Sequence, residues 1–272
     1  MPSPTPAAPR SMPVLILFGG IAFLTLVFGL IAAFYAGSPA KNAPLLVHCA
    51  ASLKTVATEI AAAYERDTGV RIELSFGGSQ TLLANISISQ RGDLFLPADD
   101  SYIALAREKN LVTSTFSVAE QSAVIAVQKG NPKRIRSLAD FRNASLTLSQ
   151  ANPEAAAIGK LLRETTAVGG LWQSLSNRAK VFKPTVIDAA NDVKLGAVDA
   201  AVVWDSMQKQ YPDLDFVRAP ELENVKAKVA ISVLKCSAQS EAAEGFARYV
   251  AAPEHGMRHF QTNGFRPLPA SP

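Results

Sequence analysis

The sequence contains few of the residues that hold small secreted folds together. Only two cysteines, Cys49 and Cys236, are present in 272 residues, and so small a number excludes a disulfide-based scaffold. Each cysteine lies in or at the end of a strand-like apolar run, where a buried free thiol is the usual state. An exported protein would also permit a bridge between them, and the sequence does not decide whether they meet.

Long runs of like charge and dense aromatic clusters are also missing. The formal net charge is +4, with both signs scattered along the chain, and aromatic residues make up 7% of the sequence. Nucleic-acid binding needs a basic face, and single-strand binding adds a platform of aromatic rings. The composition therefore excludes a nucleic-acid partner and favours a small one.

The sequence lacks the common motifs of serine hydrolases, nucleotide-binding proteins and zinc proteases. It contains no Gly-x-Ser-x-Gly elbow, no Gly-x-x-x-x-Gly-Lys-Ser/Thr loop and no His-Glu-x-x-His pair. His255 and His259 are four residues apart on a predicted helix, a spacing that can bind metal, but no third ligand is evident. We therefore predict a protein that is not an enzyme and has no cofactor and no resident metal.

One long hydrophobic run is present, at residues 14–36, and it contains no charged residue. A run of this length can cross a bilayer as a helix, and Arg10 before it favours an N-terminus that stays in the cytoplasm. We predict a signal anchor, with 1–13 as a disordered cytoplasmic tip and 37–43 as a linker. A cleaved signal peptide is the alternative. The rest of the chain is then periplasmic, either anchored to the inner membrane or secreted.

From residue 44 onward, short apolar runs alternate with helical patterns, which is typical of α/β proteins built from βαβ units. Two of the strand-to-helix turns contain a serine among small residues: Ala50-Ala51-Ser52-Leu53 and Phe76-Gly77-Gly78-Ser79. Such a turn exposes free backbone N–H groups at the positive end of a helix, which attracts anions. Each serine alone is most simply an N-cap. The pair indicates two helix ends directed at one anion.

Further motifs accompany the two serine turns in a fixed order. In the first half of the chain they are Thr68-Gly69-Val70 between the turns and the segment from Asp93 to Asp99. In the second half they are Asn152-Pro153-Glu154 with Gly159, the segment from Gly196 to Trp204, and Asn263-Gly264-Phe265. This ordered set resembles the periplasmic molybdate-binding proteins of ABC importers, within the type II periplasmic binding-protein fold, over nearly the whole of residues 44–267.

The resemblance implies an oxyanion site that both lobes build from neutral donors. The implied groups are serine hydroxyls and amides, backbone N–H groups and one aromatic side chain, from Ser52, Ser79, Ala98, Ile158, Val186 and Trp204. Roughly six to eight such donors, with helix dipoles, can hold a dehydrated dianion. A site made only of donors rejects an anion that still carries a proton. Size would then separate molybdate and tungstate from the smaller sulfate.

Two positions depart from the family pattern. Trp204 stands where the family has a tyrosine, and an indole N–H can donate a hydrogen bond but cannot accept one. Pro97 replaces a small polar residue and removes one N–H from its turn. Both departures leave the identity of the anion open.

The resemblance also implies two α/β lobes and a hinge. We expect lobe one to hold residues 44–121 and 225–272 and lobe two to hold 122–224, with chain crossings near 121–129 and 218–230. Molybdate or tungstate would bind between the lobes, favour the closed form and pass to an ABC permease and its ATPase. We expect a monomer. The alternatives are a membrane-anchored anion sensor, or a binding protein for another anion such as sulfate.

Overall fold

The computed structural model of the chain describes residues 43–167 and 170–268. The predicted tip (1–13) and membrane segment (14–36) lie outside this part of the chain, as does the linker apart from Ala43. Among the helices of the described residues, none combines the length and the hydrophobicity needed to cross a bilayer.

In the described part of the chain, nine strands form one mixed sheet with the order β2-β1-β3-β9-β4-β7-β5-β6, and β8 pairs with β4 outside this path. Their bounds are β1 (Leu45–Ala50), β2 (Ile72–Gly77), β3 (Leu94–Leu96), β4 (Val112–Gln128), β5 (Leu148–Ala151), β6 (Ala179–Lys183), β7 (Ala200–Trp204), β8 (Leu214–Val217) and β9 (Lys226–Leu234).

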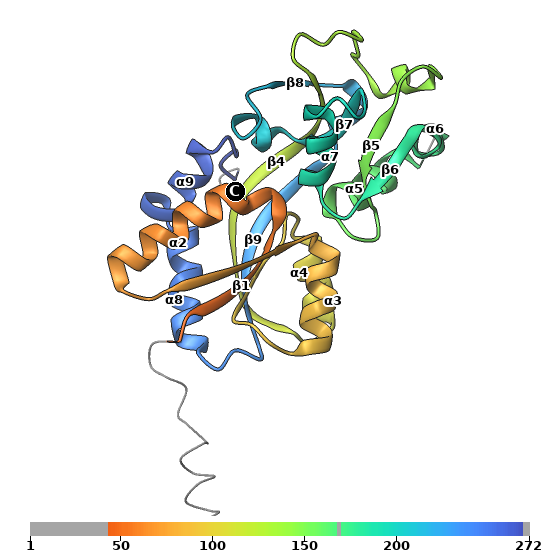
Figure 1. The fold of residues 1–272 in the computed structure, drawn as a ribbon. Helices are drawn as coiled ribbons and strands as arrows, with labels where there is room; N and C mark the ends of the chain where they lie inside the picture. The colour runs from red at the N-terminus through yellow and green to blue at the C-terminus, as the bar shows by residue number, and fades with distance from the viewer. Residues whose placement is uncertain (1–42, 168–169, 269–272) are drawn as a thin grey trace, which may run out of the picture. The chain divides into compact units, whose positions relative to one another are not determined.

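Lobe one is the half of the sheet that contains β1, β2, β3 and β9, together with its helices. β1 pairs in parallel with β2 and β3, whereas β9 runs antiparallel to β3. Helices α3 and α4 lie on one side of these strands, and α2, α8 and α9 lie on the other (Figure 1). Because both faces are covered, β1 and β3 are almost entirely buried and apolar. The helices are α2 (Lys54–Thr68), α3 (Ser79–Ser89), α4 (Ser101–Glu108), α8 (Ser240–Ala251) and α9 (Arg258–Thr262).

Lobe two is the half that contains β5, β6, β7 and β8. β5 pairs in parallel with both β6 and β7, and the helices are α5 (Ala157–Thr166), α6 (Leu171–Arg178) and α7 (Val186–Lys194). Short helical turns complete the chain: η1 (Ala51–Leu53), η2 (Leu138–Arg142), η4 (Asp205–Lys209), η5 (Pro220–Leu222) and η6 (Pro253–Met257).

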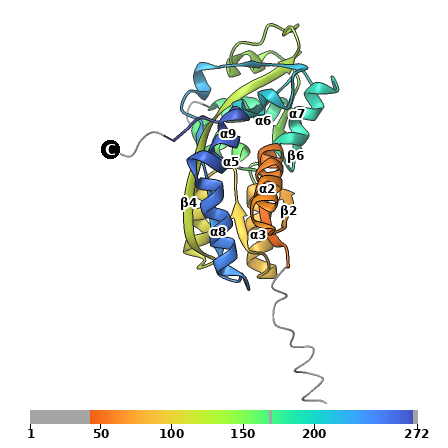
Figure 2. The same cartoon turned by 90° about the vertical axis from the view of Figure 1, so that its left-hand side faces the viewer.

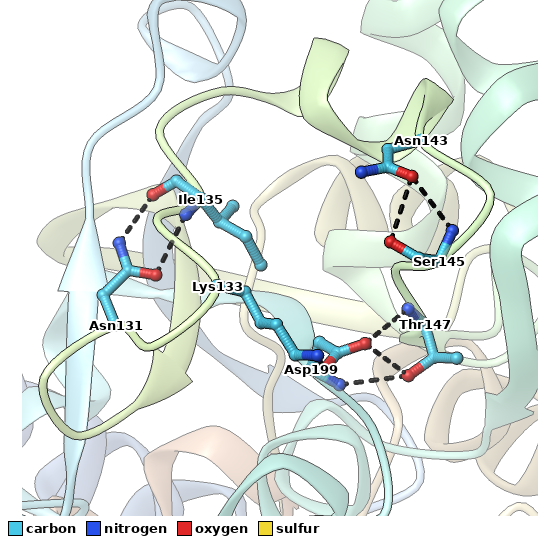
Figure 3. A network of polar contacts seen from close by, with 7 residues as sticks. All are labelled: Asn131, Lys133, Ile135, Asn143, Ser145, Thr147 and Asp199. Atoms are coloured by element: carbon cyan, nitrogen blue, oxygen red, sulfur yellow. Dashed lines mark hydrogen bonds and ion pairs between the residues drawn. The ribbon is translucent and has the colours of Figure 1, made fainter.

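The start of β5 is fixed to the start of β7 by Asp199. Its carboxylate accepts hydrogen bonds from Thr147 N at 2.7 Å and from Thr147 Oγ1 at 2.9 Å (Figure 3). In the adjoining loop, Asn131 closes a turn through two hydrogen bonds with the backbone of Ile135. These contacts lie at the end of lobe two where β5 and β7 begin, so they hold the strands in register while the opposite strand ends stay free to build a site.

The long strand β4 belongs to both lobes (Figure 2). It pairs with β9 as far as Ser122, opposite Lys226, and with β7 from Ala123, opposite Trp204. Both pairings are antiparallel, so the sheet is mixed rather than the purely parallel arrangement that βαβ alternation indicates. β4 thus changes its pairing partner from β9 to β7 between Ser122 and Ala123.

Two sequence-based alternatives are settled by the described residues. Both cysteines are free thiols, with Cys49 buried and Cys236 partly buried, and burial raises the pKa of the Cys49 thiol. His255 and His259 do not share one regular helix, because the backbone of His255 is non-helical (φ −116°, ψ −105°). The ring of His255 stacks on Tyr249, while His259 contacts Glu59.

Candidate functional site

A small cavity lies between the starts of η1, α3, α5 and α7, which follow β1, β2, β5 and β6, and the end of β7. All six residues that the sequence analysis selects for the oxyanion site line it. The full lining is Ala50, Ala51, Ser52, Gly77, Gly78, Ser79, Ala98, Ala156, Ala157, Ile158, Thr185, Val186 and Trp204. The cavity volume is about 10 Å³, close to the roughly 10–15 Å³ that one enclosed water requires. The two lobes thus leave space for one small ligand between them.

Lobe one contributes two serines, and neither is an N-cap. The N-cap positions of η1 and α3 are Ala50 and Gly78, and neither helix start has a side-chain capping bond. Ser52 is the second residue of η1 and Ser79 the first residue of α3. The simple capping interpretation of the two serines is therefore wrong, because neither hydroxyl accepts a capping hydrogen bond.

Ser79, at the start of α3, is hydrogen-bonded to another segment of lobe one. Ala98 N donates to Ser79 Oγ at 3.1 Å, so in this arrangement the Ala98 amide contacts the serine hydroxyl. Ser79 Oγ keeps its own proton, which has no protein acceptor within the described residues. Ser79 and Ala98 are 1% and 3% exposed, so this pair is withdrawn from bulk solvent apart from the cavity.

Lobe two contributes the starts of two helices. The first intrahelical bond of α5 is donated by Lys160 N to Ala156 O, so the N–H groups of Ala157 and Ile158 before it have no acceptor within the helix. Helix α7 begins with a capping box, in which Thr185 Oγ1 accepts from Asp188 N and the Asp188 carboxylate accepts from Thr185 N. The cap uses the third N–H of α7 and leaves that of Val186 at the cavity.

Trp204 closes the cavity from the end of β7. It is 1% exposed and is the largest of the fully buried side chains in the described residues. Its indole N–H has no protein acceptor within the same residues. Trp204 is held on its main chain by the pairing of β7 with β4, opposite Ala123, so its position depends on the strand that joins the lobes.

The site is neutral. None of the residues that line the cavity has an ionisable side chain. The positive potential comes instead from the N-terminal ends of η1, α3, α5 and α7, because aligned peptide dipoles place partial positive charge there. Such an arrangement can bind an anion through N–H and O–H donors.

The lobes touch each other directly beside the cavity. Gln80 N of α3 donates to Ala155 O of lobe two at 3.0 Å. A Cβ on Gly78 would lie 2.3 Å from Ala155 O and 2.7 Å from Pro184 O, distances that no side chain tolerates. Only glycine lets these backbones approach so closely. The structure therefore has the lobes closed against each other.

A second contact between the lobes joins α4 and α5. Lys160 Nζ of α5 donates to Ser101 Oγ at 3.1 Å and lies 5.0 Å from the centre of the Tyr102 ring. Asp99, next to Ala98, is buried here, and this burial raises the pKa of its carboxyl, while the bond from Ser101 lowers it. Burial also raises the pKa of the Tyr102 phenol.

A wider groove of about 520 Å³ adjoins the cavity and shares Ala51 and Thr185 with it. Two lysines, Lys54 and Lys194, are among the residues that line this groove. Asp188 lines the groove as well, and Lys194 forms an ion pair with Asp213 at 3.4 Å, so the groove carries charges of both signs.

Sequence reasoning missed two features of the site. Thr185-x-x-Asp188 is a readable capping-box pattern, and it would have fixed the start of α7 directly. Gly78 gave no comparable signal, since nothing in the sequence shows that two backbones of the other lobe lie against it.

Comparisons with known proteins agree with this geometry. A sequence profile of a family described as bacterial extracellular solute-binding proteins matches residues 45–266. The molybdate-binding protein ModA of Mycobacterium tuberculosis is 29% identical over 257 residues, which cover 90% of this chain and 96% of that protein.

Solved structures share the fold. The periplasmic molybdate-binding protein of Azotobacter vinelandii has a TM-score of 0.70 at 20% identity, with 83% of this chain and 99% of that chain covered. The sulfate-binding protein SubI of Mycobacterium tuberculosis has a TM-score of 0.75 at 17% identity, with 84% and 88% covered. Because the family profile spans almost all of the described residues, this chain belongs to the bacterial extracellular solute-binding proteins.

Proposed function

We propose that this protein captures molybdate or tungstate outside the cytoplasm and delivers it to an ABC importer. One observation carries the proposal: the donors of four helical starts, two serines and Trp204 line a single cavity that has no charged side chain. The molybdate-binding relatives from Mycobacterium tuberculosis and Azotobacter vinelandii support the choice of ligand.

The chemistry of the cavity fits a fully deprotonated tetrahedral dianion. Its oxygens accept hydrogen bonds only, and the proposed groups (the hydroxyls of Ser52 and Ser79, the N–H groups of Ala98, Ile158 and Val186, and the indole of Trp204) are donors. A ligand that carries a proton would place an O–H against another donor and lose a bond. The Ala98 N–H would act on the anion mainly through Ser79, to which it donates.

Closure would couple binding to delivery. The proposed lobes comprise 44–121 with 225–272, and 122–224, and they would rotate about β4 and the segment before β9. An anion that contacts both lobes shifts the equilibrium toward the closed form. We propose that the closed monomer docks on the permease, and that residues 14–36 anchor it to the membrane or act as a cleaved signal.

Calorimetric titration of the purified full-length chain with molybdate, tungstate, sulfate and phosphate tests the proposed ligand. We expect heat and thermal stabilisation with molybdate or tungstate and none with phosphate. Tight binding of sulfate alone would instead make the protein a sulfate-binding protein. Absence of both heat and thermal stabilisation with molybdate and tungstate would reject the proposal.

The proposed site is tested by the Ser52→Ala, Ser79→Ala double variant. Loss of two charge-assisted bonds should weaken binding at least about a hundredfold, because each is worth about 1.5–3 kcal/mol. Ser87→Ala is the matched control, since Ser87 also lies on α3 but donates to Leu83 O away from the cavity. If the double variant binds as tightly as the Ser87 control, the site is elsewhere.

A further inference from the structure

Gln121 is a fully buried polar residue at the junction of the two lobes. It lies on β4 next to Ser122, the last residue of that strand to pair with β9, and its side chain is 0% exposed. It does not line the cavity. A buried amide is costly unless its donors and acceptor are engaged, so its partners show what it does.

The Gln121 side chain joins a turn of lobe one to a turn of lobe two. Its Nε2 donates to Ala98 O at 2.9 Å, and its Oε1 accepts from Ser206 Oγ at 2.8 Å. The orientation of the amide is fixed by these partners, because a carbonyl oxygen can only accept and must face the NH₂ group. Ser206 is two residues after Trp204, and Ala98 is at the wall of the cavity.

Every bond in this chain of contacts points the same way. Ser206 donates to Gln121, Gln121 donates to the Ala98 carbonyl, and the Ala98 N–H donates to Ser79 Oγ at 3.1 Å. Each member except the last uses its proton inside the chain. The hydroxyl proton of Ser79 is left over, and Ser79 lines the cavity.

We propose that Gln121 is a positioning residue for the anion, and that it acts through Ser79. The relay Ser206–Gln121–Ala98–Ser79 holds the main chain at Ala98 through its carbonyl, and the Ala98 N–H in turn holds Ser79 Oγ. The Ala98 carbonyl and N–H belong to different peptide groups, so the relay acts by fixing positions. It orients Ser79 and leaves its O–H proton for donation to the ligand. This inference rests on the proposed anion-binding function.

The relay links recognition to closure, because its two ends belong to different lobes. Ser206 follows Trp204 in lobe two, whereas Ala98 and Ser79 belong to lobe one. At the neighbouring position, Ser122 N donates to Asp205 Oδ1 at 2.8 Å. Movement of the lobes that displaced the segment 204–206 would therefore pull on the Gln121 amide and, through Ala98, on Ser79.

A double-mutant cycle tests the relay in the full-length protein. Gln121→Met keeps the length of the side chain and removes both bonds. We expect binding of molybdate or tungstate to weaken about tenfold, the equivalent of one hydrogen bond to a charged group. In a Ser79→Ala background the same change should cost less than about threefold, and in a Ser52→Ala background it should still cost about tenfold, because Ser52 is outside the relay.

Equal costs of Gln121→Met in both serine backgrounds would overturn the inference, since a general loosening of the fold would affect the two serines alike. If Gln121→Met does not fold, Ser206→Ala takes its place in the cycle, with an expected loss of about threefold that also vanishes only with Ser79→Ala. If the parent protein binds none of the anions, the proposed function fails. If the parent binds and the cycle is additive, only the relay fails.

Discussion

The two walls of the cavity present different kinds of donor. Lobe one supplies two serine hydroxyls at the uncapped starts of η1 and α3. Lobe two supplies main-chain N–H groups at the starts of α5 and α7, together with one indole. A hydroxyl can be deleted by a point mutation, whereas a main-chain N–H can only be displaced. We therefore expect anion binding to be sensitive to side-chain substitutions in lobe one and to displacement of the backbone in lobe two.

This difference extends to how each wall is held. The α7 start is fixed by its own capping box, so its geometry is local and depends on two residues, Thr185 and Asp188. The Ser79 wall has no such cap and depends on Ala98, which in turn contacts Gln121 from another strand. A wall built from local contacts tolerates lobe motion, while one built from distant contacts responds to it.

The largest expected effect on anion binding comes from a substitution that prevents the two lobes from making contact beside the cavity. Gly78→Val should weaken anion binding at least about a hundredfold, or about 2.7 kcal/mol, because its side chain would collide with the backbone at Ala155 and Pro184. Titration calorimetry measures the affinity. Small-angle scattering with saturating molybdate should show that the variant stays more extended than the parent.

Gly245→Ala, on α8, is the control for Gly78→Val. Gly245 does not line the cavity, and a Cβ there would meet only the hydroxyl of Tyr64, at 3.3 Å, so binding should stay within about threefold of the parent. If Gly78→Val closes and binds normally, the lobes do not need the contact seen here.

A smaller effect is expected from removing the one side-chain donor of lobe two. Trp204→Phe should weaken binding about tenfold, through the loss of one N–H to a charged ligand. Trp204→Tyr restores a donor and should recover part of that loss. Trp172→Phe, at a tryptophan outside the cavity lining, controls for the general effect of shortening an indole. If the Trp204→Phe variant binds as tightly as the parent protein, the indole N–H does not contribute to binding, and lobe two binds the anion through main-chain donors alone.

A still smaller effect is expected from the contact between α4 and α5. Lys160→Met removes the bond to Ser101 Oγ and the cation over the Tyr102 ring. Partly exposed contacts of this kind are worth about 0.5–1 kcal/mol, so anion release in stopped-flow experiments should be about threefold faster. Lys109→Met, at an exposed lysine at the end of α4, should leave the rate unchanged. A rate that falls with Lys160→Met would show that the contact opposes closure.

The smallest effect concerns Asp99 and is a matter of pH. Burial raises the pKa of this carboxyl above its unfolded value, so the folded protein binds the proton more tightly than the unfolded chain. Stability then falls as pH rises from the unfolded pKa through the folded pKa. Asp99→Asn should remove this dependence and raise Tm at pH 7 by about 2 °C or less. Thermal melts from pH 4 to 8, with Glu108→Gln at the exposed end of α4 as the control, measure it; an unchanged pH profile contradicts the assignment.

Local sequence patterns predicted the strands and helices around the site well, because those elements depend on neighbouring residues. The apolar run before Ser52 and the Gly-Gly-Ser turn before α3 are short-range signals. The gathering of Ser52, Ser79, Ala98, Ile158, Val186 and Trp204 at one cavity followed from family resemblance, since no local pattern shows which strand ends meet.

Contacts between segments that are distant in the sequence could not be predicted from local sequence patterns. Asp205, directly after Trp204, is the first residue of η4. Its carboxylate accepts from Ser122 N and from Arg266 of the C-terminal segment. Gln121 carries no sequence signal either, because a single glutamine in an apolar strand acquires meaning only when its two partners, Ala98 and Ser206, are known.

The position of Trp204 gives the protein a built-in optical reporter. The chain has two tryptophans, and only Trp204 is at the cavity, while the ring of Trp172 lies beside Phe182 at the far strand β6. Indole emission depends on the polarity and charge of its surroundings, so an ion that occupies the cavity alters the fluorescence of one tryptophan and leaves the other as an internal reference. The residue that distinguishes this site from the family pattern thereby also makes its occupancy visible without a label.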